Sequence, residues 1–231
     1  MSFISQSVTD GVTVVAIDRP PANAMNVELL DELVARLEEL AADSPSALVV
    51  AGREGFFSAG ADLKAVPRYD AGDQRKMVSG INRMAILTYG LPCPVIGAIT
   101  GHAIAGGLVF ALCADYRIAS DAGRYGLTEI RVGVPFPQAA IGVVRAELNP
   151  VAARTLVLGS ELTDADTCLR LGVFDEVLPG DAVVARAVSV AREMAALPAD
   201  VYARSKLDLR APALSAMRAG ADADPLLEAW V

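Results

Sequence analysis

Residues 101–120, GHAIAGGLVFALCADYRIAS, contain the pattern that decides the fold. The first part of this stretch ends a run, 84–114, that has no charged residue, and an uncharged run of that length is also typical of a membrane-spanning helix. Prolines and glycines interrupt the run, however, and each cluster would break a single spanning helix. We therefore expect a buried strand over 94–100, a glycine turn, a buried helix over 105–114 and a strand over 116–120, with no membrane segment.

Segments before this stretch indicate further strands. Residues 3–8 and 12–17 are strand-like on either side of Asp10-Gly11, a pair that favours the positive φ angles of a tight hairpin turn. Residues 47–51, ALVVA, are wholly apolar, which is typical of a strand buried on both faces of a sheet. The chain is therefore expected to begin with a hairpin and to continue into a buried sheet.

Helical periodicity appears between and after these strands. Apolar residues recur on one face over residues 27–42, and Asn26 before them is suited to cap the helix N-terminus. Helices dominate the second half, with one short strand at 173–178. Strands that alternate with helices predict an α/β core over residues 1–178, followed by a C-terminal helical region over 179–231. The later helices are expected at 151–158, 164–171 and 181–197, and from Pro198 onward.

Composition narrows the class of protein. The chain has 231 residues, 53% of them hydrophobic, and it is long enough for one large domain with a sizeable core. A net charge of −8 argues against general nucleic-acid binding. Three cysteines without a C-x-x-C spacing indicate a reducing compartment, and a single histidine excludes a metal site built from several histidines. Because the N-terminus shows no secretory signal, the protein is expected in the cytoplasm.

Two glycine-bearing turns point to chemistry. Each follows a predicted core strand: SAGAD at 58–62, and HAIAGG at 102–107. Small residues let the backbone approach a ligand, and the first N–H groups of a helix have no partner within it. Two such N–H groups directed at one point would form an oxyanion hole. Either turn alone is better explained as a tight bend that requires small residues.

Taken together, the motifs resemble those of the enoyl-CoA hydratase/isomerase (crotonase) superfamily. FFSAGADLK at 56–64 is similar to its first oxyanion motif, and residues 101–120 are similar to its second. RYGLTEIRVGVPFP at 124–137 is similar to the segment that carries a catalytic carboxylate, and residues 20–40 to a CoA-contacting loop and first helix. The resemblance implies an α/β fold, a crotonase-like spiral of ββα units, with a C-terminal helical region shorter than usual. It also implies homotrimers, which can pair into hexamers.

Carried over by position, the resemblance gives roles to individual residues. The N–H groups of Ala61 and Gly106 would hold the thioester oxygen, and Glu129 would be the catalytic carboxylate. The ligand would be an acyl-CoA thioester. No metal and no separate cofactor are expected, because coenzyme A is part of the substrate. The other residues expected along the substrate are Ala22, Asn23, Ala24, Ala59, Gly60, Asp62, Leu63, Lys64, Gly107, Val109 and Pro135.

Val109 is the most informative departure from the hydratase pattern. Hydratases of the family carry a glutamate at this position, and it shares one water with the glutamate that Glu129 matches. A valine can neither accept a proton nor hold a water. The hydratase-type glycine-rich turn after Glu129 is also replaced, by VPFPQ at 134–138. One carboxylate with an apolar partner position resembles the Δ3,Δ2-enoyl-CoA isomerases, in which a single base moves a proton from C2 to C4.

Alternatives to this interpretation stay open. Hydration of a 2-enoyl-CoA is one, and another single-carboxylate reaction of the superfamily, such as thioester hydrolysis, is a second. A third is a protein that binds acyl-CoA without turnover. Glu129 itself could be an ordinary surface carboxylate paired with Arg131 or Arg124.

A few polar and aromatic residues near these motifs are expected to have structural roles. Asp62 would cap the helix that follows the first glycine turn, and Asp115 would pair with Arg117. His102 would pack within a loop. Trp230 would serve in packing or in a subunit contact rather than in ligand binding.

Overall fold

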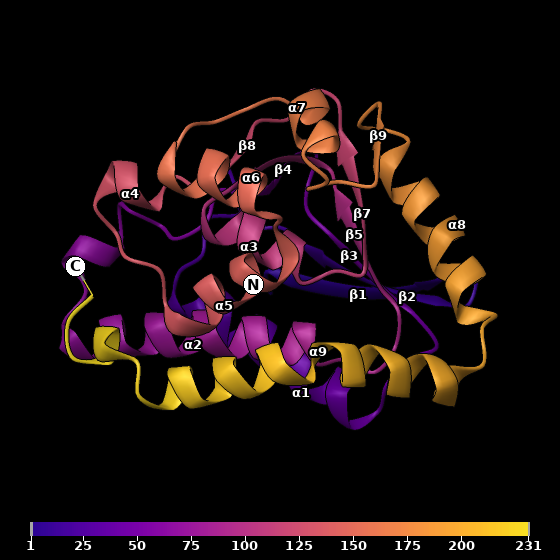
Figure 1. Ribbon diagram of the computed structural model, residues 1–231, viewed down its shortest axis with the longest axis horizontal. Helices are drawn as coiled ribbons and strands as arrows, with labels where there is room; N and C mark the ends of the chain where they lie inside the picture. The colour runs from indigo at the N-terminus through magenta and orange to yellow at the C-terminus, as the bar shows by residue number, and fades with distance from the viewer. Residues whose placement is uncertain (1, 231) are drawn as a thin grey trace.

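A six-stranded sheet forms the centre of the protein. The computed structural model describes residues 2–230, and Figure 1 shows the sheet enclosed by helices. The first two strands pair antiparallel through the predicted hairpin turn, and every later neighbour in the sheet is parallel. In spatial order the strands are β1 (Ile4–Thr9), β2 (Val12–Ile17), β3 (Leu48–Ala51), β5 (Val95–Ile99), β7 (Tyr116–Ser120) and β9 (Glu176–Leu178).

A second, smaller sheet lies beside the first. Its three parallel strands are β4 (Gly55–Ser58), β6 (Gly101–Ile104) and β8 (Tyr125–Gly126). Each follows one strand of the large sheet and precedes a helix, so the chain repeats a ββα unit. The expected spiral of ββα units is thus confirmed. The sequence predicted only a loop and a glycine turn where β4 and β6 form, because strands of four residues rich in glycine have weak patterns.

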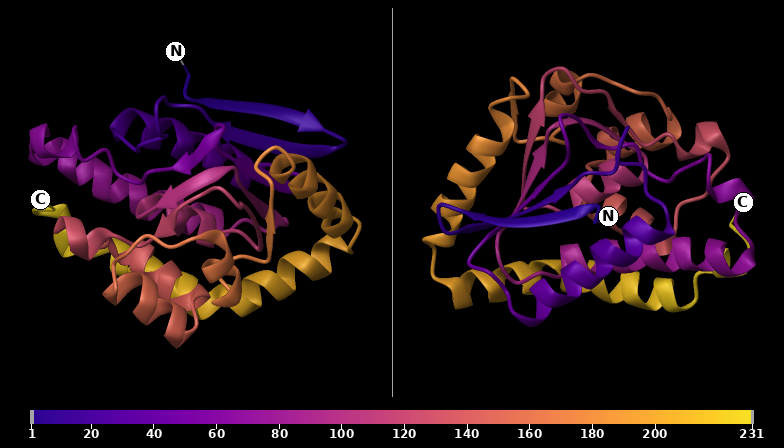
Figure 2. Two further views of the ribbon diagram at one scale, coloured as in Figure 1. Left: turned by 90° about the horizontal axis from the view of Figure 1, so that it is seen from above. Right: turned by 180° about the vertical axis from the view of Figure 1, so that it is seen from behind.

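Helices cover both faces of the large sheet. Figures 1 and 2 show α8 alone along one side and the other long helices gathered on the opposite side. In chain order, the α-helices of the described residues are α1 (Val27–Ala42), α2 (Ala71–Tyr89), α3 (Gly106–Leu112), α4 (Glu129–Val132), α5 (Gln138–Glu147), α6 (Pro150–Ala153), α7 (Ala165–Arg170), α8 (Val183–Ala195) and α9 (Ala199–Asp222). Short turns add η1 (Val66–Arg68), the π-helical η2 (Arg154–Leu158) and η3 (Pro225–Leu227).

Alternate residues of the strands supply two apolar cores. Leu48 and Val50 of β3 face the larger core, which α1, α2, α3, α5 and α9 complete, whereas Val49 faces α8. This alternation follows from the two-residue period of a strand. It explains why residues 47–51 are apolar throughout, as the sequence predicted. No helix of the described chain is both long and apolar enough to cross a membrane.

Side-chain caps fix where the helices begin. The Asn26 side chain accepts a hydrogen bond from the N–H of Leu29, as expected, and Asp70 does the same for α2. The prediction that Asp62 caps a helix is wrong. Its carboxylate instead accepts the N–H groups of the next turn and pairs with Arg19 at 3.0 Å. Only the short 3-10 turn η1, which has no side-chain cap, lies between that turn and Asp70.

Buried ion pairs hold α9 against the sheet. Asp115 contacts Lys206 Nζ at 2.7 Å and Arg210 Nη2 at 3.0 Å, and both cations are buried. Arg117 pairs with Glu147 at 3.2 Å. The expected Asp115–Arg117 pair is therefore wrong, because the partners come from helices far along the chain. Removing one partner of such a pair would leave an uncompensated buried charge, which is strongly destabilising.

Candidate active site

The carboxyl ends of the small sheet bring the predicted site residues together. Ala61 follows β4, Gly106 follows β6 and Glu129 follows β8. Because the three strands are parallel, the segments that leave them lie at one edge of the sheet. All three residues line the same cavity.

The two glycine turns lie directly against each other. A Cβ atom added at Gly60 would lie 2.8 Å from the carbonyl oxygen of Ile104 and 3.0 Å from the nitrogen of Gly106. Gly60 also has φ near +77°, which only glycine adopts without strain. Ala105, just before α3 begins, has a side chain and a φ of +51°, so its backbone is strained. Close contact therefore requires glycine at 60, and the turn at Ala105 sets the direction of the Gly106 N–H.

Two backbone N–H groups at this contact are free to bind a ligand. Gly106 is the first residue of α3, so its N–H has no acceptor within the helix. The neighbours of Ala61 are engaged: Gly60 accepts from Met25, and Asp62 donates back to Met25. Within residues 2–230, neither Ala61 nor Gly106 donates its own N–H to a protein acceptor. The pair can hold a negatively charged oxygen.

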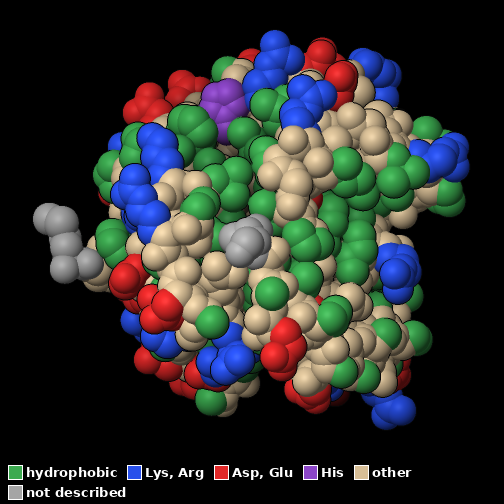
Figure 3. Space-filling view, turned by 90° about the vertical axis from the view of Figure 1, so that its left-hand side faces the viewer, with side chains coloured by type: hydrophobic (Ala, Val, Ile, Leu, Met, Phe, Trp, Pro, Cys, Tyr) green, Lys and Arg blue, Asp and Glu red, His purple; other side chains and the backbone are tan. Residues whose placement is uncertain are grey.

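The cavity between the turns and Glu129 is small and apolar. Its volume is about 250 Å³. Figure 3 views the side of the molecule on which α4 and the C-terminal segment lie, and apolar side chains gather at its centre. Glu129 is the only cavity residue, among those described, with an ionisable side chain. The wall consists of Ala59, Ala61, Leu63, Ile81, Ile104, Ala105, Gly106, Thr128, Glu129, Val132, Val134, Pro135, Pro137, Ala140 and Trp230.

Glu129 is a buried carboxylate without a partner. Its side chain is 6% exposed, and Oε2 has no hydrogen bond in the described structure. Burial disfavours the charged form and raises the pKa of Glu129 to about 8. The alternative of a surface ion pair is wrong, because Arg131 binds Glu161 and Ser160 instead. A carboxyl group with such a pKa is suited to exchange protons near neutral pH.

The backbone around Glu129 is tightly bonded. Gly133, in the left-handed conformation, ends α4 and donates to the carbonyl oxygens of Glu129 and Ile130. The N–H of Val134 also donates to Glu129 O at 3.0 Å. From the other side, Ser160 Oγ accepts the N–H of Arg131 at 3.1 Å. The short helix is thereby held in place despite having only one turn.

Ala59, Leu63 and Pro135 also line the cavity, and the other residues expected along the substrate are not part of its described wall. Ala22, Ala24, Asp62 and the exposed Lys64 are outside its described wall. Gly60 and Gly107 act through close packing: a Cβ at Gly107 would lie 2.2 Å from Ser58 O.

Asn23 and Val109, two further residues expected along the substrate, are buried away from the cavity wall. Asn23 is buried, and its amide donates to the carbonyl oxygens of Ile17, Phe56 and Phe57, so it holds the loop before α1. Val109 is fully buried in the larger core and is not part of the described cavity wall. It therefore places no polar group beside Glu129.

Trp230 packs in the core, as expected, and it also lines the cavity. Its indole lines the wall beside Pro135 and is 5% exposed. Its place on the cavity wall is the feature that the sequence did not predict. No periodicity or motif surrounds it, so only the path of the chain after α9 brings it to the site.

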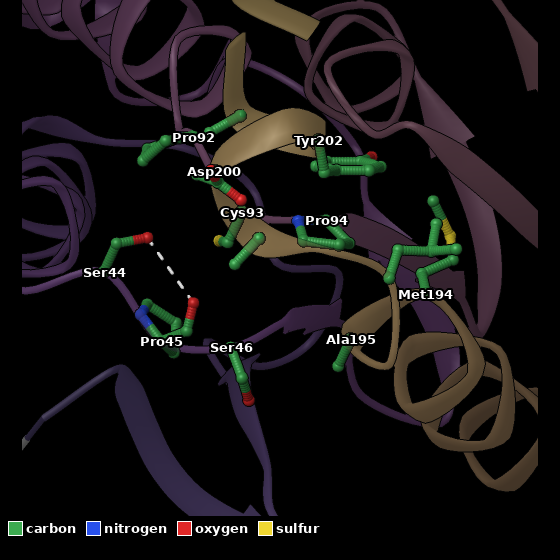
Figure 4. Close-up of a pocket in the computed structure, with 13 residues that line it drawn as sticks. Ser44, Pro45, Ser46, Pro92, Cys93, Pro94, Met194, Ala195, Asp200 and Tyr202 are labelled. Carbon is green, nitrogen blue, oxygen red and sulfur yellow. Dashed lines mark hydrogen bonds between the residues drawn. The ribbon is translucent and has the colours of Figure 1, made fainter. Parts of the chain in front are cut away.

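A second cavity, of about 340 Å³, lies at the corner between α8 and α9 (Figure 4). Serine, proline and alanine side chains dominate its wall, together with Cys93, Asp200 and Tyr202. Burial raises the pKa of the Cys93 thiol, which keeps it protonated and unreactive at neutral pH. We assign no chemistry to this cavity.

Two free backbone donors and a buried carboxyl group line one apolar cavity, an arrangement suited to stabilising an oxyanion and exchanging a proton. Residues 7–227 match the family model described as enoyl-CoA hydratase/isomerase. The chain is 32% identical over 228 residues to the "probable enoyl-CoA hydratase echA17" of Mycobacterium avium, covering 96% of this chain and 84% of the relative. It is 31% identical over 219 residues to human mitochondrial "enoyl-CoA delta isomerase 1", covering 93% and 72%.

Solved structures agree with these relatives. The enoyl-CoA hydratase EchA3 of Mycobacterium ulcerans superposes with a TM-score of 0.91 at 31% identity, over 99% of both chains. A structure described as the apo form of the Mtb enoyl-CoA isomerase superposes with a TM-score of 0.88 at 32% identity, over 96% of both chains. The protein belongs to the enoyl-CoA hydratase/isomerase family.

Proposed function

We propose that the protein moves a double bond, converting a 3-enoyl-CoA thioester into a 2-enoyl-CoA thioester. One observation carries the proposal: Glu129 is the sole ionisable side chain on the described cavity wall, and its Oε2 atom has no partner. A site of this kind has one proton-transferring group and no second group to activate a water. Double-bond migration requires nothing more.

The proposed reaction uses one carboxyl group and two backbone N–H groups. Ionised Glu129 removes a proton from C2 of the 3-enoyl thioester, and the negative charge spreads onto the thioester oxygen as a dienolate. The N–H groups of Ala61 and Gly106 stabilise that oxygen in a cavity with an apolar wall, where hydrogen bonds are strong. The same carboxyl group, now protonated, returns the proton at C4. The proton is conserved, and no electron acceptor is needed.

Further features of the proposal concern what the protein binds and how it assembles. Coenzyme A enters as part of the substrate, with no separate cofactor. The described chain is acidic overall, so the phosphates of coenzyme A need basic side chains close to the site, and Lys64 is exposed on the turn that carries Ala61. We also propose a homotrimer, or a pair of trimers, as the working assembly.

Hydration of a 2-enoyl-CoA is the second candidate function. The observation in its favour is the likeness to the probable enoyl-CoA hydratase of M. avium, which spans 96% of this chain. Against it stands the wall of the cavity: a water that attacks C3 would find one carboxylate and otherwise apolar contacts.

Comparing the two reactions on the purified protein tests the proposal. We expect isomerisation of a 3-enoyl-CoA to be markedly faster than hydration of the matching 2-enoyl-CoA, because only hydration needs a fixed water. The two products can be separated by chromatography in one assay. Faster hydration would favour the second candidate. Absence of both reactions, together with tight acyl-CoA binding, would favour a non-catalytic role.

The pKa of Glu129 predicts the pH dependence of the reaction. The base form is needed to remove the C2 proton, so kcat/KM is expected to rise with pH and to level off above about 8. Steady-state rates at a series of pH values, with substrate well below KM, give this profile. A profile that is already level at pH 6 would show that Glu129 titrates normally or is not the base.

The same pKa predicts how stability changes with pH. The folded-state pKa of about 8 lies above the ordinary value of 4.5, so the stabilising contribution is complete below pH 4.5 and is lost as pH rises through 8. The loss is at most about 5 kcal/mol, at about 1.4 kcal/mol per pH unit. Glu129→Gln has no titrating group at this position and should not show this loss. The melting temperature of the variant should therefore rise relative to that of the wild type as the pH goes from 5 to 9. An equal decline in both proteins would contradict the burial argument.

A further inference from the structure

The C-terminal segment contributes a large aromatic wall to the cavity. Figure 1 shows the chain leaving α9 and turning toward α4. Trp230 lies at the end of this turn, 5% exposed, with its indole on the cavity wall. Its Nε1–H donates to the carbonyl oxygen of Pro135 at 3.1 Å. Pro135 lies shortly after Glu129 and lines the same cavity, so the indole is fixed to the loop that follows the proposed base.

Asp224 anchors this segment to the body of the protein. It is 3% exposed, and its Oδ2 atom accepts hydrogen bonds from Asn82 Nδ2 at 2.9 Å and from the N–H of Gln138 at 2.8 Å. Its Oδ1 atom accepts the N–H of Leu226 at 3.0 Å, which caps η3. The segment is therefore bonded to α2 and to the start of α5. Because Asp224 and Trp230 are both bonded to the rest of the protein, the indole has a fixed position on the cavity wall.

The size of the cavity fits a short ligand. Its volume of about 250 Å³ is below the range of roughly 300–1,000 Å³ that is usual for ligand pockets. A longer acyl chain would have to displace the indole, break its hydrogen bond to Pro135 and expose an aromatic ring to water. Each of these changes opposes binding.

We propose that Trp230 determines acyl-chain length by closing the acyl part of the cavity, so that the protein prefers short-chain acyl-CoA thioesters. This inference rests on the proposed function for the identity of the acyl group. It assigns to the residues after α9 a role in substrate selection. Trp230 is a specificity residue and takes no part in proton transfer.

Fluorescence provides a direct test on the unmodified protein, because Trp230 is the only tryptophan in the chain. Saturated butanoyl-, octanoyl- and dodecanoyl-CoA are added separately, with free coenzyme A as control. We expect butanoyl-CoA to shift the Trp230 emission and free coenzyme A to leave it unchanged. Affinity should fall by roughly tenfold or more toward dodecanoyl-CoA, which is the scale on which a pocket discriminates by methylene content.

Substitutions distinguish an effect of Trp230 on chain-length preference from an effect on folding. Trp230→Ala should remove the discrimination and improve dodecanoyl-CoA binding at least about tenfold relative to butanoyl-CoA. Trp230→Phe keeps most of the ring and should shift the preference less in the same direction, which maintains the test if the alanine variant unfolds. Leu226→Ala is the matched control: Leu226 packs against the core from the same segment but does not line the cavity, so the ranking should stay that of the wild type. Binding to all three variants is measured by calorimetry. Two of them lack the tryptophan, and emission from Leu226→Ala is not compared because the surroundings of its tryptophan change.

The outcomes distinguish this inference from the proposed function. If the wild type binds all three thioesters with equal affinity, or if Trp230→Ala keeps the wild-type ranking, the chain-length role of Trp230 is overturned while the family assignment stands. If the wild type binds no acyl-CoA thioester, the proposed function itself fails. If it binds short-chain thioesters preferentially but does not isomerise them, the chain-length role of Trp230 is supported and the proposed reaction is not.

Discussion

Glu129→Gln is expected to lower the turnover of a 3-enoyl-CoA by at least about 10²-fold, the lower end of what general acid–base groups contribute. Glutamine has nearly the size of glutamate and can still form hydrogen bonds, but it cannot accept the C2 proton. No other ionisable side chain lines the described cavity, so none is placed to replace it. KM is expected to change little, because the acyl group contacts the apolar wall in both proteins. Steady-state kinetics separate kcat from KM.

Glu161→Gln is the matched control for this substitution. Glu161 is an exposed carboxylate that pairs with Arg131, close to α4 in space but outside the cavity wall. Exposed pairs contribute little, so this variant should keep near-native turnover. A Glu129→Gln protein that also turns over at the native rate would rule out Glu129 as the base. A loss of equal size in both variants would point to damage of α4 rather than to lost basicity.

Gly60→Ala is expected to have the second largest effect. The added Cβ would lie 2.8 Å from Ile104 O and would force a residue with a side chain to adopt φ of +77°. The two turns must then separate, which moves the N–H groups of Ala61 and Gly106 apart. Losing one well-placed oxyanion donor costs about 10²–10³-fold in kcat, and the strain lowers stability by roughly 1–3 kcal/mol. Kinetics and chemical unfolding measure the two losses.

Gly106→Ala is the contrasting substitution. Its added Cβ would meet Met25 Sδ at 3.7 Å and Gly60 Cα at 3.8 Å, which are ordinary contacts, and its φ angle is not positive. It should therefore unfold at nearly the wild-type denaturant concentration. If Gly60→Ala were as stable and as active as the wild type, the close contact of the two turns would not be needed for the site.

Local patterns predicted the elements that carry their own periodicity. Helix α1 has the bounds expected from the spacing of its apolar residues, and Asn26 caps it as expected. Strand β7 also has the expected bounds, and the hairpin of β1 and β2 turns at Asp10-Gly11. These elements were predictable because the period of the side chains and the turn chemistry are properties of neighbouring residues.

Elements without such a period were not predicted. Strands β4, β6 and β8 have two to four residues each, and they exist because each pairs with the next across the small sheet. The partners of Asp115 likewise lie in α9, which no local pattern connects to β7. Pairing between distant segments depends on the whole fold, so a sequence window cannot contain it.

The sequence alone determined the family, the α/β spiral, and the identity of Ala61, Gly106 and Glu129 as candidate site residues, because these depend on motifs of adjacent residues. Tertiary structure alone decided that the three meet at one edge of a small parallel sheet, that Glu129 is buried with its pKa raised, and that Trp230 lines the cavity. Burial is a property of everything packed around a group, contributed here by β4, β6, β8, α5 and the segment after α9. That surrounding structure forms only when the chain has folded.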